Sequence, residues 1–132
     1  MGAMQSQQAE GPSGDMIELF FLKAGRPRTL RPGERLIHEG QQVPSVFLVT
    51  AGELVLKKKQ EKNRKDKVVG GSRFKGALLG ELSLLLGQPA TVSVDAAAQG
   101  ETPASVLEIA QGELVSMLQR DPKMAGGFFR LL

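Results

Sequence analysis

The pattern of apolar and polar positions divides the chain into a helical start, a β-rich middle and a helical end. Residues 16–23 are mostly apolar, which predicts a short, well-packed helix that Asp15 can cap. From about residue 28 to 109, short β-rich segments alternate with turns roughly every 8 to 12 residues. Residues 111–120 return to helical spacing, with Leu114 and Leu118 on one face. This order favours a β-sandwich or barrel with flanking helices.

Individual strands can be read from the middle of the chain. β-Branching and length predict a strand over residues 45–50, and period-2 alternation predicts another over 53–57. The basic stretch from Lys57 to Lys67 should form a hairpin loop, with Val68 and Val69 beginning the return strand. Two further strands are expected over residues 90–97 and 105–109. Glycines at the turns supply the positive φ angles that tight connections need.

The two ends of the chain read differently from the middle. Residues 1–14 are polar and predict a flexible leader, and residues 15–132 then form one domain with a β-roll at about 28–109. Helices are expected over about 111–132, with a break at Asp121-Pro122. The last helix is apolar and contains Gly126-Gly127, and we expect it to lead into a neighbouring domain of a longer protein. Its apolar residues are Met124, Phe128, Phe129, Leu131 and Leu132.

Composition and charge exclude several classes of function. The chain has no cysteine and one histidine, so thiolate chemistry, zinc–thiolate sites and multi-histidine metal sites are excluded. The net charge is +3, but residues 57–67 hold seven basic and two acidic residues, so the basic character belongs to one hairpin. The absence of Trp and Tyr argues against base-stacking platforms, and no nucleic-acid partner is expected. No nucleophile, base and oxyanion donor stand out together, so we do not expect an enzyme.

The stretch from Leu79 to Val94 carries the most information about function. It combines a glycine turn, a carboxylate, a short apolar helix, a Gly-x-Pro turn and a β-branched segment, read as LGELSLLLGQPATVSV. This order resembles the phosphate-binding cassette of the cyclic-nucleotide-binding domain family. The upstream segments RPGERLIHEGQ (31–41) and VFLVTAGEL (46–54) are similar to the same family. The resemblance spans about residues 17–132 and implies a mainly β fold with flanking helices, a β-jelly roll of the cyclic-nucleotide-binding type.

The resemblance also implies a set of ligand-binding residues. In the family the cassette glutamate accepts a hydrogen bond from the ribose 2′-hydroxyl, and the glutamate at that position here would be Glu81. The backbone N–H groups that follow the glutamate hold the cyclic phosphate. The implied site residues are Gly80, Glu81, Leu82, Ser83, Ala90, Thr91 and Ser93. The implied ligand is cyclic AMP or cyclic GMP, with no cofactor and no metal. A plainer interpretation of Glu81 is that an acidic residue stabilises the first turn of a helix.

One position departs from the family pattern. Ala90 stands where the family has the arginine that pairs with the phosphate. Losing such a charge-assisted contact, worth about 1.5–3 kcal/mol, would weaken binding roughly 10- to 150-fold. Arg73 is the nearest basic side chain before the cassette and is a candidate to compensate. We therefore expect a non-catalytic regulatory module, cut from a larger protein, with weak or lost cyclic-nucleotide binding.

Two alternatives remain open from the sequence. The chain could be a genuine cyclic AMP or cyclic GMP sensor with a compensating donor. It could instead be an interaction module that uses the hairpin from Lys57 to Lys67 on an anionic membrane or a protein, although a solvated hairpin tip is the plainer interpretation of that run. Either way the expected location is the cytoplasm or the cytoplasmic face of a membrane.

Overall fold

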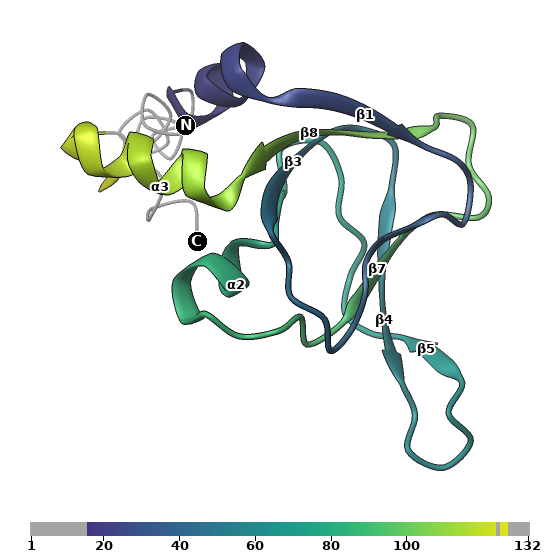
Figure 1. Cartoon of the computed structure of the whole chain (residues 1–132). Helices are drawn as coiled ribbons and strands as arrows, with labels where there is room; N and C mark the ends of the chain where they lie inside the picture. The colour runs from purple at the N-terminus through teal and green to yellow at the C-terminus, as the bar shows by residue number, and fades with distance from the viewer. Residues whose placement is uncertain (1–15, 124, 127–132) are drawn as a thin grey trace, which may run out of the picture.

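Two four-stranded antiparallel sheets form the body of the protein (Figure 1). The computed structural model describes residues 16–123 and 125–126. In the first sheet the strand order is β1 (Arg26–Leu30), β8 (Ala104–Ala110), β3 (Ser45–Ala51) and β6 (Leu78–Leu79). In the second sheet it is β2 (Arg35–Ile37), β7 (Ser93–Ala96), β4 (Leu54–Lys59) and β5 (Asp66–Val68). This is the β-jelly roll with flanking helices that the sequence predicts.

The two sheets differ in how many of their faces are buried. In β3, Phe47 and Val49 belong to the core between the sheets, whereas Val46 and Leu48 pack with the helices on the opposite face. The first sheet is therefore covered on both sides, which explains why residues 45–49 form a continuous apolar run. The second sheet contributes residues such as Leu54 to the inner core only, so its outer face carries polar side chains.

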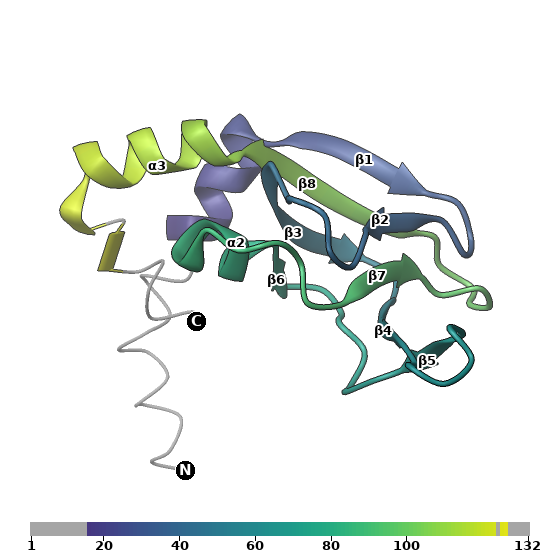
Figure 2. The same ribbon diagram turned by 60° about the horizontal axis from the view of Figure 1, so that its bottom comes forward.

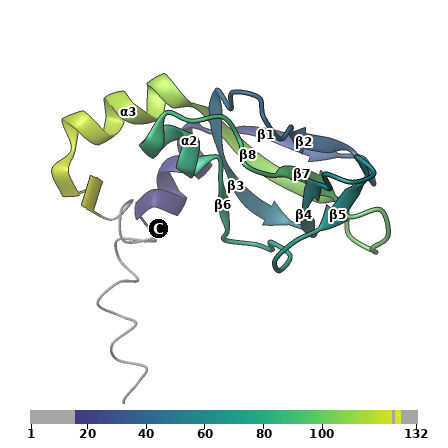
Figure 3. The same ribbon diagram turned by 90° about the horizontal axis from the view of Figure 1, so that it is seen from below.

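Helices gather at one end of the sheets (Figures 2 and 3). They are the helix over residues 16–24, α2 (Glu81–Leu86) and α3 (Gln111–Arg120). Ile17 and Phe21 from the first and Leu114 from α3 are fully buried in the same cluster as Val46 and Ile109. The helices predicted over residues 16–23 and 111–120 are thus confirmed, because their apolar spacing matches the face that the first sheet offers.

The turn between β3 and β4 shows why the sequence places glycine there. Gly52 has a φ of 76°, and a Cβ atom at this position would lie 2.5 Å from the Cα of Ala104. Only glycine tolerates both the left-handed backbone and the close approach of the neighbouring chain.

The structure corrects two strand boundaries. The return strand of the hairpin begins at Asp66 rather than at Val68, with Lys59 paired to Asp66, so the loop comprises only residues 60–65. The tip is tight because the Gln60 N–H donates to the Lys65 carbonyl and Arg64 adopts a φ of 60°. In the basic hairpin, residues 57–67, paired strand residues thus lie on both sides of the tip at 60–65.

The other correction concerns the strand expected over residues 90–97. It begins at Ser93, because Ala90 hydrogen-bonds with Gly40 and Gln41 in the loop after β2 instead of joining the ladder. The predicted leader over residues 1–14 lies outside the described residues. So do the apolar side chains expected in the last helix, Met124, Phe128, Phe129, Leu131 and Leu132.

Candidate functional site: a pocket beside the cassette helix

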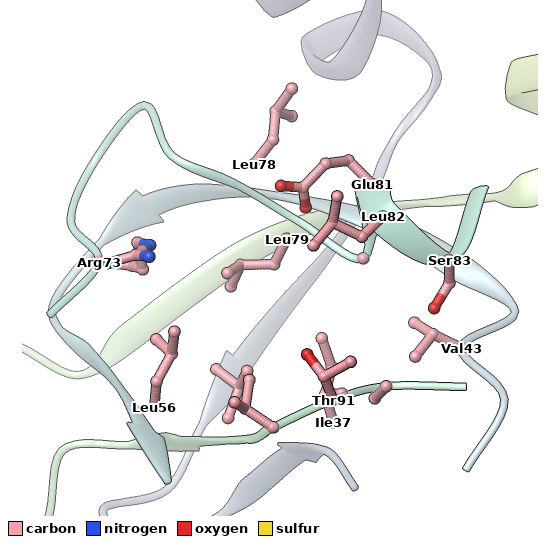
Figure 4. Close-up of a pocket in the computed structure, with 14 residues that line it drawn as sticks. Ile37, Val43, Leu56, Arg73, Leu78, Leu79, Glu81, Leu82, Ser83 and Thr91 are labelled. Atoms are coloured by element: carbon pink, nitrogen blue, oxygen red, sulfur yellow. The ribbon is translucent and has the colours of Figure 1, made fainter. Parts of the chain in front are cut away.

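A pocket of about 130 Å³ lies between α2 and the inner face of the second sheet (Figure 4). Apolar side chains make most of its wall, and two hydroxyls and two charged groups interrupt them. Its lining residues are Ile37, Val43, Leu56, Arg73, Leu78, Leu79, Gly80, Glu81, Leu82, Ser83, Ala90, Thr91, Val92 and Val94. A concave apolar site with a few polar groups is the usual form of a small-molecule site.

Two glycines set the position of α2 at the pocket. Gly80 precedes the helix with a φ of 85°, and a Cβ there would lie 2.6 Å from the Ser45 carbonyl oxygen. Gly87 ends the helix in the left-handed conformation and donates its N–H to the Ser83 carbonyl. The Ser83 hydroxyl donates to the Gln88 carbonyl at 2.8 Å, which ties the following loop back to the helix.

Six of the seven site residues predicted from the sequence meet in this pocket. Gly80, Glu81, Leu82 and Ser83 come from the start of α2, and Ala90 and Thr91 come from the segment before β7. The seventh, Ser93, does not line the pocket. Side chains alternate along β7, so Val94 faces the pocket while the buried Ser93 hydroxyl accepts the N–H of Glu39 at 2.9 Å.

The pocket has two distinct ends. Figure 4 shows Ser83 and Val43 at one end and Arg73 at the other, with Glu81 and Thr91 between them. Ala90 belongs to the first end, because its N–H donates to Gln41 at 2.9 Å and its carbonyl accepts from Gly40 at 2.8 Å, in the loop that leads to Val43. The sequence predicted the residues at the first end of the pocket and missed most of those at the second end.

Arg73 is placed in the pocket by a contact distant in sequence. Its N–H and carbonyl pair with those of Leu54 at 2.8 and 2.9 Å, which fixes the segment after the hairpin against β4. One Nη of Arg73 donates to the Gly71 carbonyl at 2.6 Å. The only signal in the sequence was that Arg73 is the nearest basic residue before the cassette, because nothing local predicts a pairing with Leu54.

A separate charge network covers the outer face of the second sheet. The Arg35 guanidinium binds the carboxylates of Asp95 at 2.6 Å and Asp66 at 2.7 Å, and Lys57 Nζ lies 3.1 Å from Asp95. Burial alone would raise the pKa of Asp95, but the hydrogen bonds from Arg35 and Lys57 outweigh it and lower that pKa. The hydrogen bond from Arg35 lowers the pKa of Asp66, and the two carboxylates together raise that of Arg35. We call these four residues the charge network.

The basic hairpin also touches the pocket wall. Lys58 Nζ donates to the Thr91 carbonyl at 3.0 Å and lies 3.2 Å from a carboxylate oxygen of Glu39. The Lys59 N–H donates to Glu39 at 2.9 Å, and this hydrogen bond is the main cause of a lowered pKa at Glu39.

The part of the chain that the structure describes has neither a candidate metal site nor a helix that could cross a membrane. No three residues among its His, Asp and Glu side chains come together as a group able to hold a metal ion. None of the helices there is long and apolar enough to cross a membrane.

Comparison with known proteins identifies relatives of this fold. The model of a family described as the cyclic nucleotide-binding domain matches residues 27–121. The chain is similar to the catabolite activator protein of Thermus thermophilus, with a TM-score of 0.71 and 19% identity over 88% of this chain and 52% of that one. The chain thus spans about half the length of that protein. No match was found among proteins with curated functions.

Two further solved structures share the fold. A cyclic nucleotide-binding domain from Methylobacillus flagellatus has a TM-score of 0.70 and 20% identity, over 83% of this chain and 58% of that one. The regulatory domain of Toxoplasma gondii PKA, solved with cAMP, has a TM-score of 0.59 and 20% identity, over 74% of this chain and 34% of that one. At such identities the likeness concerns the fold.

Proposed function

The chain belongs to the cyclic nucleotide-binding domain family, and from this premise we propose that it is a non-catalytic regulatory module that binds cyclic nucleotides weakly. In the proposed binding mode, the Glu81 carboxylate accepts a hydrogen bond from the ribose hydroxyl. The phosphate lies at the end of the pocket that holds Ala90 and Ser83. The module would pass occupancy of the pocket to a neighbouring domain of a longer protein.

The observation that carries this proposal is Ala90. Its place in the pocket beside Ser83 and Thr91 supports the idea that it stands where a phosphate would bind, but its side chain supplies no charge. Hydroxyl and N–H donors remain for the phosphate, but none of them supplies the positive charge and the paired donors of an arginine. Binding should therefore be weaker than in relatives that have an arginine here.

Calorimetric titration of cyclic AMP and cyclic GMP tests the proposal. The wild type should bind in the high micromolar range or weaker, and Ala90→Arg should tighten binding by about tenfold. Gln88→Arg is a matched control, because it adds the same charge at an exposed position that does not line the pocket. Sub-micromolar binding by the wild type would contradict the proposal, and so would an equal gain from both variants.

A second candidate function rests on the basic hairpin. Five of its cations form no ion pair with any of the described residues, and Figure 1 shows the tip extending away from the helices. They are Lys59, Lys62, Arg64, Lys65 and Lys67. Each basic residue near an anionic membrane surface contributes about 1 kcal/mol of attraction. The hairpin is thus suited to phosphate-bearing lipid headgroups.

Cosedimentation with vesicles that contain phosphatidylserine tests this second function. Binding should be strong at low salt, fall steeply as salt rises, and be lost when Lys62, Arg64 and Lys65 are changed to glutamine. Changing Lys23, Lys75 and Lys123, three cations outside the hairpin, to glutamine provides the control. If both triple variants lose vesicle binding equally, the protein is attracted to the membrane by its overall charge, and the hairpin is not a dedicated binding surface.

A further inference from the structure

Arg73 differs from most other arginines of the structure in having no acidic partner. Four of the arginines described form ion pairs with carboxylates, namely Arg26, Arg28, Arg31 and Arg35. Arg73 forms none, although Glu81 lines the same pocket. The only hydrogen bond that its side chain makes within the described residues uses one N–H, to the Gly71 carbonyl. Most of a partly buried guanidinium is therefore left facing the pocket with donors to offer.

The position of Arg73 decides what it would meet. It lies at the opposite end of the pocket from Ser83, and Glu81 lies between the two (Figure 4). If the phosphate occupies the Ala90 end and the ribose lies at Glu81, the base extends toward Arg73. The wall near Arg73 includes the apolar Leu56, which suits the face of a purine.

We propose that Arg73 recognises the O6 and N7 edge of guanine and makes cyclic GMP the preferred ligand. This proposal rests on the proposed function, because it uses the binding mode given there. Guanine presents two adjacent acceptors, O6 and N7, which match the paired donors of a guanidinium. Adenine presents N7 beside an amino donor, and a guanidinium has no acceptor for that donor. The pocket would thus distinguish purines by the edge that faces Arg73.

The test is the ratio of affinities, measured by calorimetry for cyclic GMP, cyclic AMP and cyclic IMP. A good bidentate contact should favour cyclic GMP over cyclic AMP by about fivefold or more. Cyclic IMP has O6 and N7 but lacks the 2-amino group, so it should bind like cyclic GMP. Arg73→Ala should bring the three affinities together, chiefly by weakening cyclic GMP and cyclic IMP.

Two further variants separate base recognition from charge. Arg73→Lys keeps the positive charge without the paired donors, so it should lose most of the preference for cyclic GMP. Lys75→Ala removes a charge two residues away that does not line the pocket, and it should leave the ratio unchanged. An equal loss of all three nucleotides in Arg73→Ala would overturn the proposal, because it would place the phosphate at Arg73.

Failure of this inference can be told apart from failure of the proposed function. Binding of all three nucleotides with equal affinity would overturn the guanine preference and leave the binding function intact. If the wild type binds too weakly to measure, the same ratios are taken in Ala90→Arg, which strengthens the phosphate end. If that variant also binds none of them, both proposals are wrong.

Discussion

Arg35 and Arg73 show two opposite uses of the same side chain. Arg35 lies on the outer face of the second sheet, where its guanidinium is bound by Asp95 and Asp66. The side chain of Arg73 lines the pocket and forms a single hydrogen bond among the described residues, to a backbone carbonyl. In the charge network two carboxylates neutralise the guanidinium of Arg35, whereas no carboxylate of the described residues pairs with Arg73 in the pocket. Whether an arginine stabilises the fold or can bind a ligand therefore depends on its partners and not on its residue type.

The network also explains how the basic hairpin is held. Asp95 is 5% exposed, and it sits between Arg35 of β2 and Lys57 of β4, while Asp66 lies on β5. These ion pairs join strands from three parts of the sequence across one sheet. Breaking a buried pair costs more than forming it contributes, because the remaining charge loses its compensation. The network should therefore matter for stability and not for binding.

The largest expected effect comes from the backbone of the pocket. Gly80→Ala should destabilise the fold by about 3 kcal/mol, because a left-handed alanine costs about 1–2 kcal/mol and its Cβ would clash with the Ser45 carbonyl. Gly87→Ala is the matched control: its φ is also positive, but a Cβ there meets open space. Urea unfolding measures both. If both variants lose the same free energy of unfolding, the clash at Gly80 is relieved by movement of the chain.

The next effect tests the network directly. Arg35→Ala should lower the free energy of unfolding by about 2 kcal/mol, because it leaves the buried Asp95 with Lys57 as its remaining partner. We expect this loss of stability to be smaller than the full cost of breaking a buried ion pair, because the Arg35 side chain is 28% exposed. Chemical denaturation at neutral pH measures it. A loss within experimental error would mean that solvent or Lys57 fully replaces the guanidinium.

Acid should weaken the network by a smaller amount. The pKa values of Asp95 and Asp66 are lowered in the folded protein, so their stabilisation is complete above the unfolded value of about 3.9. It is lost as the pH falls through the lowered folded values. Thermal unfolding followed from pH 6 to pH 2 should show this decline. Asp95→Asn should start less stable and lose less between pH 5 and pH 2 than the wild type, and parallel curves would count against the role of Asp95.

The smallest loss of stability is expected at Arg73. Arg73→Ala should change the free energy of unfolding by no more than about 0.5 kcal/mol, because its guanidinium has no carboxylate partner in the described structure. The urea midpoint measures this change beside that of Arg35→Ala. A loss as large as that of Arg35→Ala would show that Arg73 stabilises the fold and is not held available for a ligand.

Much of the fold was predictable because its signals are local. Helical spacing predicted α3 over residues 111–120, and β-branching predicted β3, since both patterns repeat within a single element. The boundaries that failed, at Asp66 and Ser93, depend on how a segment pairs with another strand or loop. Such pairing is decided by residues far away in the sequence, so no local pattern reports it.

The same division holds for the candidate site. The short helix at Glu81, the glycine before it and the uncharged residue Ala90 can be read from the sequence alone, because they lie in one continuous stretch. Only the tertiary structure turned Ser93 away from the pocket and brought in Arg73 through its pairing with Leu54. The pairing of Arg35 with Asp95, 60 residues away, likewise depends on how the strands come together. Propensity and spacing act over a few residues, whereas a pocket and a charge network exist only where distant segments meet.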